Sequence, residues 1–431
     1  MEKLRLIIAL ALLALLGGCK SPVTPDEGEK PDIPAPADYS EYTSVPLTGT
    51  LTGVQPMTGI VLWTDNDHLE TDCIQLEYSY LRYNDICSQK DVYNWDVVEK
   101  LLNAVSKRGH QAVIRFYYTY VGKQCTVPDY IKALPDYEET VGKSEGKKTY
   151  FPDWRNSELQ RFHLEFYRRL AERYDHDPRL AFLETGFGLW AEYHIYDGPY
   201  ILGKTFPSKE FQAEWIQKMD TWFTDTPWCI SIDAADYGPF DKKPDLLSGR
   251  FGNFDDSFMC EEHDEENLPN WQFFGKERYK KAPLGGEFSY YTDYDQEHCL
   301  DKKGIHGRTF EAEAARFHLT FIIGNDQPDY QSMARIKEAS LATGYRFCIR
   351  DFRIKEGKGA AVLIENTGVA PIYRDAWVEV EGVRSTYNLR NLMPGEQQWV
   401  PVDTPSASPS SVPAIACDHL VKGQRIGFDV Y

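Results

Sequence analysis

The chain has 431 residues and a formal net charge of −19, and 14% of its residues are aromatic. This negative charge argues against nucleic acid as a partner, because phosphates are repelled unless a basic stripe compensates, and the sequence contains no such stripe. A neutral ligand such as a sugar is compatible with it, and the aromatic residues could form packed core layers or flat platforms in a cleft.

The first residues have the pattern of a signal peptide. Lys3 and Arg5 precede an apolar stretch over residues 6–16, which is too short to span a membrane as a mature helix. The following Leu-Gly-Gly-Cys resembles a bacterial lipobox that ends at Cys19. We therefore predict a signal peptide over residues 1–18 and lipidation of Cys19, with an ordinary signal sequence as the alternative. The expected location is the bacterial cell envelope, periplasmic or surface-exposed, with a lipid anchor in the outer membrane as the sole membrane contact.

Residues 19–46 are rich in Pro, Asp, Glu and Ser and contain few apolar residues. Such a segment cannot bury enough surface to fold by itself, so we predict a disordered tether. The remaining residues 47–431 are more than one hydrophobic core usually supports. One large barrel followed by a small second domain is the natural division.

Residues 47–343 alternate between short apolar runs and amphipathic segments, which is typical of a parallel sheet covered by helices. The runs that predict strands cover residues 59–65, 75–81, 111–118, 180–188, 227–233, 257–262, 283–288 and 320–326. The main predicted helices cover residues 94–108, 157–174, 208–223, 310–319 and 331–341. Eight such strands indicate a (β/α)8 TIM barrel, of the α/β class.

From residue 344 onward the pattern changes to short strand-like pieces separated by turn residues. This pattern predicts a small C-terminal β-sandwich over residues 344–431.

The sequence contains nine cysteines, so eight remain besides Cys19, and their spacing does not determine any pairing. Cys229, Cys260 and Cys348 lie inside strand-like runs and should be buried thiols. No CxxC or HExxH spacing suggests a zinc site. The sequence GFGLWA matches a loose dinucleotide fingerprint, but a polar loop follows it instead of a helix. We expect neither a metal nor a cofactor.

Two glutamates lie at the ends of predicted strands: Glu192 follows the fourth, and Glu287 ends the seventh. The carboxyl ends of barrel strands point side chains into one shared cup. Hydrolysis of a glycosidic bond needs a proton donor and a second carboxylate, which attacks the anomeric carbon or activates water. We therefore predict Glu192 as acid/base and Glu287 as nucleophile. The alternative is that each glutamate pairs with an arginine at the rim.

Other residues at predicted strand ends could contact the same substrate. Arg115 could hold the nucleophile ionised, or form an ordinary rim salt bridge. His194 could bind a sugar hydroxyl or adjust the pKa of Glu192, or it could be a simple loop residue. Aromatic side chains could stack on sugar rings or pack in the core: Trp190, Tyr117, Tyr118, Tyr193, Tyr290 and Tyr291.

Two acidic segments follow predicted strands. Asp65, in TDNDH after the first strand, could bind a cation or sugar hydroxyls, or belong to a capped polar loop. Glu261, in CEEHDEE after the sixth strand, is the main rival for a catalytic carboxylate or a metal ligand, and a solvated acidic loop is the alternative.

Several longer segments carry a family pattern: RGHQAVIRFYY, RYDHDPRLAFLETGFG with LWAEYH, and GYRFCIRDFRI with ENTGVAPIYRDAWVEV. Over about residues 59–380 the chain resembles a bacterial barrel family labelled domain of unknown function 4832, in which a Trp-Gly-Glu-Trp-His type motif follows the fourth strand. The resemblance implies a barrel with a C-terminal β-sandwich, similar in layout to clan A glycoside hydrolases. That clan has its acid/base after strand four and its nucleophile at the end of strand seven, which correspond to Glu192 and Glu287. The clan usually has Asn before the acid/base, and this chain has Ala191 there.

Together these observations predict a lipid-anchored glycoside hydrolase that cleaves a carbohydrate substrate by a retaining two-glutamate mechanism. The alternative is a non-catalytic glycan-binding lipoprotein on a degenerate glycosidase barrel, which Ala191 makes plausible.

Overall fold

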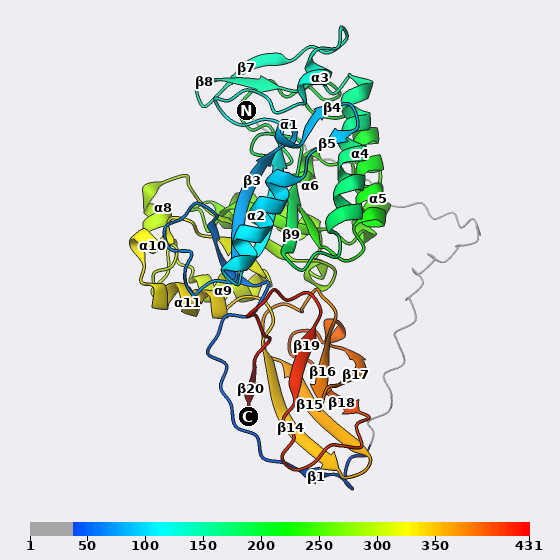
Figure 1. Ribbon diagram of the computed structural model, residues 1–431. Helices are drawn as coiled ribbons and strands as arrows, with labels where there is room; N and C mark the ends of the chain where they lie inside the picture. The colour runs from blue at the N-terminus through cyan, green and yellow to red at the C-terminus, as the bar shows by residue number, and fades with distance from the viewer. Residues whose placement is uncertain (1–37) are drawn as a thin grey trace, which may run out of the picture. The chain divides into compact units, whose positions relative to one another are not determined.

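The structure is a computed structural model that describes residues 38–431. The predicted signal peptide, the lipidation of Cys19 and most of the predicted tether lie outside these residues. Residues 39–431 form one compact unit (Figure 1). Within the described part of the chain, no helix combines the length and apolar character needed to cross a membrane.

Eight parallel strands close into a barrel, which confirms the predicted (β/α)8 fold. In order around the barrel they are β2 (Gly59–Trp63), β3 (Leu76–Arg82), β6 (Gln111–Tyr117), β9 (Leu180–Thr185), β10 (Trp228–Ser231), β11 (Gly252–Phe258), β12 (Leu284–Phe288) and β13 (Phe321–Ile323). Strand β13 pairs with β2 and closes the ring. These strands are almost entirely buried, which explains why their sequences are apolar on both faces.

The sixth barrel strand differs from the prediction. The sequence suggested residues 257–262, whereas β11 spans Gly252–Phe258 and contains Asp255 and Asp256. The pairing of β11 with β12 is irregular between Asp255 and Phe258, as in a β-bulge. Asp255 is buried and accepts hydrogen bonds from Asn267 and Trp271, so a strand can hold these charges because each has partners.

Helices connect the strands, and the longer ones agree with the predictions within a few residues. They are α1 (Tyr83–Ile86), α2 (Asp96–Lys107), α3 (Asp129–Lys132), α4 (Ser157–Tyr174), α5 (Lys209–Trp222), α6 (Ala234–Tyr237), α7 (Leu268–Phe273), α8 (Asp293–His298), α9 (Phe310–Arg316), α10 (Gln327–Tyr330) and α11 (Met333–Leu341). Figure 1 shows the two longest, α4 and α5, side by side. The N-cap of α4 is Asn156, whose side chain accepts from Leu159 N at 2.9 Å.

Two hairpins lie in the connections: β4 (Cys87–Gln89) with β5 (Val92–Tyr93), and β7 (Thr140–Ser144) with β8 (Lys147–Phe151). All eight cysteines of the described residues are free thiols. Cys229, Cys260 and Cys348 are buried, as predicted.

The C-terminal residues form two further sheets. One contains β1 (Thr43–Ser44), β14 (Phe347–Lys355), β15 (Gly359–Asn366), β18 (Gln397–Val402) and β20 (Phe428–Val430). The other contains β17 (Val383–Asn388), β16 (Ala376–Val380) and β19 (Ala414–Cys417). Because β1 pairs with β14, the end of the segment predicted as a tether belongs to the fold.

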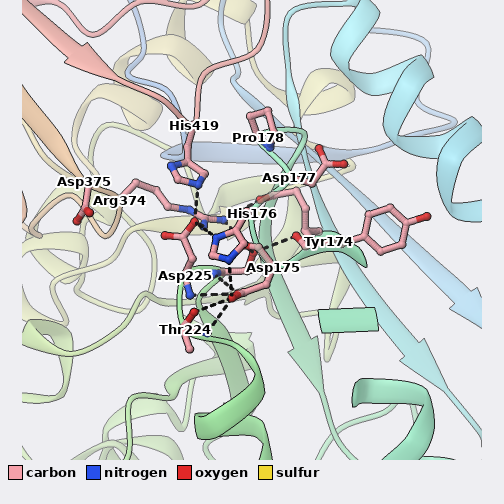
Figure 2. Close-up of polar contacts among 12 residues, drawn as sticks. Tyr174, Asp175, His176, Asp177, Pro178, Thr224, Asp225, Arg374, Asp375 and His419 are labelled. Atoms are coloured by element: carbon pink, nitrogen blue, oxygen red, sulfur yellow. Dashed lines mark hydrogen bonds and ion pairs between the residues drawn. The ribbon is translucent and has the colours of Figure 1, made fainter. Parts of the chain in front are cut away.

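A buried arginine joins this C-terminal part to the barrel. Arg374 donates to the carbonyl of Leu180, at the start of β9 (2.9 Å), and its Nη1 lies 3.2 Å from Asp225 Oδ2. Figure 2 shows that Asp225 also contacts His176 and His419. Burial alone would raise the pKa of Asp225, but the bonds from His419 and Arg374 hold it below its ordinary value. The contact is therefore an ionic anchor between the two parts.

Candidate active site

Arg115 lies on β6 and is completely buried. Its Nε donates to Glu184 Oε2 on β9 (2.9 Å), and its Nη1 donates to Asp256 Oδ2 on β11 (2.6 Å). The guanidinium also stacks over the ring of Phe254 at 4.1 Å. A buried charge needs such partners, because leaving it unpaired is costly. The sequence suggested that the charge of Arg115 keeps Glu287 ionised. In the structure, Arg115 instead forms its hydrogen bonds with Glu184 and Asp256.

The Arg115 network connects to a larger cluster of titratable groups at the carboxyl ends of the barrel strands. Two cationic side chains, Arg115 and His194, belong to it. Five carboxyl groups interact with them or with one another: Glu184, Glu192, Asp233, Asp256 and Glu287. Burial raises the pKa of Glu184 to about 7, and the charge of Arg115 offsets part of this rise. Full ionisation would leave a strong excess of negative charge, so the cluster favours retention of a proton.

A strained loop presents Glu192. Trp190 and Ala191 have φ values of 56° and 57°, and Glu192 N donates to the carbonyl of Leu189 at 2.9 Å. This is a tight turn with two left-handed residues that are not glycine, each of which costs about 1–3 kcal/mol. The Trp190 carbonyl accepts from Arg115 at 3.3 Å. The buried arginine therefore helps to hold the turn that carries Glu192.

Two glycines allow this loop to fold back on itself. A Cβ on Gly188 would lie 1.7 Å from the carbonyl oxygen of His194, and one on Gly186 would lie 2.3 Å from that of Ala191. The backbone N–H of Leu189 donates to the same His194 carbonyl at 3.0 Å. The glycines of GFGLWA therefore serve close backbone packing around Glu192.

His194 lies between two carboxylates. Its Nε2 is 2.8 Å from Glu192 Oε2, and its Nδ1 is 2.9 Å from Asp233 Oδ1. Asp233 follows β10 and also accepts from the Ser231 hydroxyl at 2.8 Å. Burial disfavours a charged imidazole, but the two carboxylates raise the pKa of His194 well above its ordinary value. Glu192 therefore has a cation at hydrogen-bond distance.

Glu287 is the penultimate residue of β12 and is partly exposed. Burial raises its pKa well above the ordinary value, Asp256 adds to the rise, and Arg115 only partly opposes it. Burial also raises the pKa of Glu192, but His194 counteracts the effect. The charges of Glu192 and Glu287 both raise the pKa of Tyr80, and the charge of Glu192 also raises the pKa of Glu287. The two predicted catalytic groups therefore belong to one electrostatic cluster.

An aromatic wall lies next to Arg115. The Tyr80 hydroxyl accepts from Arg115 Nη1 at 3.2 Å. The ring centroids of Tyr80 and Tyr117 are 5.7 Å apart, those of Tyr80 and Tyr120 are 5.9 Å apart, and those of Tyr120 and Trp190 are 4.2 Å apart. Tyr117 and Trp190, which the sequence predicted as platforms for a sugar ring, both belong to this wall.

Tyr118 does not belong to the site, and its prediction as a sugar platform is wrong. Its ring stacks on Tyr83 with centroids 4.1 Å apart, and its hydroxyl is 3.0 Å from His163 Nδ1 of α4. The residue is fully buried. Neighbouring residues of an extended chain point to opposite faces, so Tyr117 faces the mouth and Tyr118 faces the helices.

Tyr193 is also fully buried, with its ring packed on Phe187 and Phe206, so it is a core residue and its prediction as a sugar platform is wrong. The other predicted residues lie in exposed loops. Asp65 is in the turn after β2, and Glu261 is in the turn after β11, three residues beyond the strand. Tyr290 and Tyr291 follow β12 with exposed fractions of 48% and 69%. Within residues 38–431, no hydrogen bond or ion pair joins Asp65 to the cluster.

Three carboxyl groups of the cluster were not predicted from the sequence: Glu184, Asp233 and Asp256. The signal was a carboxylate inside an apolar run, opposite an arginine on the next strand: Arg115 and Glu184 are direct partners in the β6–β9 pairing. Asp256 was not found because the sixth strand was predicted at residues 257–262, whereas β11 spans Gly252–Phe258.

Glu192, His194 and Asp233 could each offer one ligand atom to a cation, with these atoms within 4.8 Å of one another. The two carboxylates face different ring nitrogens of His194. This arrangement fits an imidazolium that lies between two carboxylates, whereas a metal ligand would keep one nitrogen for the ion.

No family model and no curated protein matches the chain, so the resemblance to domain of unknown function 4832 stays a prediction. Among solved structures, the chain is similar to a GH5_18 variant from Bifidobacterium longum subsp. longum in complex with Manb1-4GlcNAc (10% identity, TM-score 0.41, covering 68% of this chain and 81% of that chain). It is also similar to PbGH5A, a glycoside hydrolase family 5 enzyme from Prevotella bryantii (10% identity, TM-score 0.38, 68% and 99% covered). A third is GH5_18 from Streptomyces cattleya in complex with GlcNAc (11% identity, TM-score 0.40, 63% and 70% covered). These TM-scores are below 0.5, so the similarities carry no argument about this chain. The fold class is derived from the strand order of this chain, and its function has to be derived from the residues of its own site.

Proposed function

We propose that the chain is a glycoside hydrolase that cleaves a glycan at the barrel mouth by a retaining mechanism, with Glu192 and Glu287 as the catalytic pair. The observation that carries the proposal is their placement in one cluster at the carboxyl ends of the strands, where the pKa of each is raised. One protonated and one ionised carboxyl group are what glycosidic hydrolysis requires. The proposed reaction needs no metal or cofactor.

The proton distribution bears on the separate roles. The sequence assigned acid/base to Glu192 and nucleophile to Glu287. The imidazolium of His194 favours ionised Glu192, while Glu287 has the more strongly raised pKa. These contacts favour the reverse assignment, with Glu287 as acid/base and Glu192 as nucleophile. The two roles therefore need a test that identifies each of them from the reaction product.

Substitution tests the pair. Glu192→Gln and Glu287→Gln should each reduce kcat/KM by about 100-fold or more on a panel of aryl glycosides and oligosaccharides. Glu356→Gln, in an exposed turn of the C-terminal sheet, is the matched control. Activity that survives both active-site substitutions would refute the assignment.

Azide distinguishes the roles. With an activated aryl glycoside, alanine in place of the nucleophile should yield a glycosyl azide of inverted configuration, and alanine in place of the acid/base should yield one of retained configuration. Proton NMR of the first product of the unmodified enzyme tests retention itself. Carboxyl groups about 5–5.5 Å apart predict retention, and a separation of about 6.5–9.5 Å predicts inversion.

One observation favours the alternative of a non-catalytic glycan-binding protein. Ala191 stands where an Asn would contact the sugar 2-hydroxyl, and it is completely buried, so it cannot make this contact. The alternative predicts glycan binding without turnover, unchanged by Glu192→Gln. Calorimetric titration with oligosaccharides that are then checked for cleavage separates the two functions.

We further propose that the chain is an envelope lipoprotein anchored through Cys19, and that the C-terminal sheets pack as a β-sandwich that braces the barrel. The lipobox supports the anchor. Cys19→Ser should abolish incorporation of labelled palmitate and release the protein from membranes, and retention of the label would exclude this anchor.

A further inference from the structure

A cavity of about 330 Å³ lies beside the barrel mouth, which is the lower end of the range typical of ligand pockets, about 300–1,000 Å³. Its lining includes Glu261, Glu262, Tyr291, Tyr294, Asp295 and His306. Two of its three wall segments continue directly from β11 and β12, the strands that carry Asp256 and Glu287. The cavity is therefore at the same end of the barrel as the candidate active site.

The floor of the cavity is held by side-chain contacts. Asp295 is buried, its Oδ1 is 2.9 Å from His306 Nε2, and its Oδ2 accepts from the Ser289 hydroxyl at 2.7 Å. His306 has a left-handed backbone with φ of 47°. Such strain persists only where the surroundings hold the residue in place. The floor is thus preorganised.

Two tyrosines form exposed walls. Tyr291 and Tyr294 have exposed fractions of 69% and 54%. The Tyr294 ring lies 4.4 Å from that of His298, and the backbone N–H of Tyr291 donates to the Ser289 hydroxyl at 3.1 Å. Exposed aromatic rings in one short loop are typical of a binding surface.

The charges of the cavity select the ligand. Glu261 and Glu262 are exposed at its rim, and no lysine or arginine lines it among the described residues. The nearby Arg308 is engaged with Asp264 at 3.1 Å and with the Glu261 carbonyl at 3.4 Å. Carboxylates accept hydrogen bonds from sugar hydroxyls but repel uronate or sulfate groups.

We propose that this cavity is a glycan-binding subsite that takes an uncharged sugar unit, with the ring stacked on Tyr291 or Tyr294 and its hydroxyls bonded to Glu261 and Glu262. Binding of a sugar unit in the cavity does not depend on the proposed hydrolase function. Cleavage of a bond near this unit does rest on that function. The substrate class that follows is a neutral oligosaccharide that extends from the mouth over β11 and β12.

Calorimetric titration of the full chain carrying Glu287→Gln tests the subsite without turnover. The probes are tetrasaccharides of β-1,4-linked glucose, mannose and xylose, and the acidic tetragalacturonate. At least one neutral probe should bind, and Tyr291→Ala and Tyr294→Ala should each weaken its binding about tenfold or more. Tyr431→Ala, at the 92% exposed C-terminal residue, is the matched control and should leave the affinity unchanged.

Three results would overturn the proposal: no binding of any neutral probe at millimolar concentration, equal affinity in the tyrosine variants, or tighter binding of tetragalacturonate. Glu261→Gln with Glu262→Gln adds a second test, because it should improve the binding of tetragalacturonate relative to the neutral probe. Failure of the hydrolase proposal gives a different result. In that case, the protein without Glu287→Gln turns over no glycan, while tyrosine-dependent binding of a neutral probe persists and supports the subsite.

Discussion

Replacing Glu287 by glutamine should stabilise the fold while it removes activity. Within residues 38–431 no side chain is hydrogen-bonded to the Glu287 carboxylate, and burial near Asp256 raises its pKa well above the ordinary value. A carboxyl group with a raised pKa in the folded state lowers the free energy of unfolding by about 1.4 kcal/mol for each pH unit between its unfolded and folded pKa values, and the partial exposure of Glu287 reduces this cost. Glutamine has the same shape and no charge, so we expect the free energy of unfolding at neutral pH to increase by about 1–3 kcal/mol. For a chain of this length, this corresponds to a rise in Tm of about 1–4 °C.

The stabilisation must depend on pH. The folded state holds the Glu287 proton more tightly than the unfolded state, so the free energy of unfolding of the unmodified protein falls as pH rises from the ordinary glutamate pKa through the raised pKa. The amide does not titrate, so the two proteins should differ little at about pH 4 and most above the raised pKa.

Differential scanning calorimetry at acidic and neutral pH measures this difference, with the exposed Glu356→Gln as control. A lower Tm for Glu287→Gln at neutral pH, or an equal difference at both pH values, would refute the reasoning.

Three further substitutions test the surroundings of the pair. Arg115→Met leaves buried carboxylates without their cation and should lower the free energy of unfolding by about 3–5 kcal/mol in chemical denaturation, and a loss below about 1 kcal/mol would contradict the buried network. His194→Gln removes the cation that lowers the pKa of Glu192, so the limb of the pH–rate profile governed by Glu192 should move to higher pH, and an unmoved limb would argue against the contact. Gly188→Ala places a Cβ 1.7 Å from a carbonyl oxygen, so the loop must shift and kcat/KM should fall about tenfold or more, with unchanged kcat/KM as the contrary result.

The barrel could be predicted because its strands are buried on both faces and therefore apolar throughout. The sixth strand escaped this rule, since Asp255 and Asp256 interrupt its apolar run. Their burial depends on Asn267, Trp271 and Arg115, which lie far away in sequence. A local pattern cannot reveal such partners.

The same limit applies to the site. The positions of Glu192 and Glu287 at strand ends follow from topology, which periodicity reveals. The neutralisation of Arg115 by Glu184 does not, because it depends on the register between the adjacent strands β6 and β9 and on the orientation of both side chains. The error at Tyr118 was of another kind, since strand alternation alone would have separated it from Tyr117.

The boundary near residue 344 separates the barrel from the C-terminal sheets in sequence. Because Arg374 anchors one part to the other, the two parts do not fold independently. The arginine comes from the C-terminal part, but its partners, the carbonyl of Leu180 and the carboxylate of Asp225, belong to the barrel. A barrel cut free of this part would lose the cation that balances Asp225, and the sheets alone would carry a guanidinium without its partners. The C-terminal part is thus not an exchangeable module, and recombination between related chains could move the barrel only together with its own Arg374.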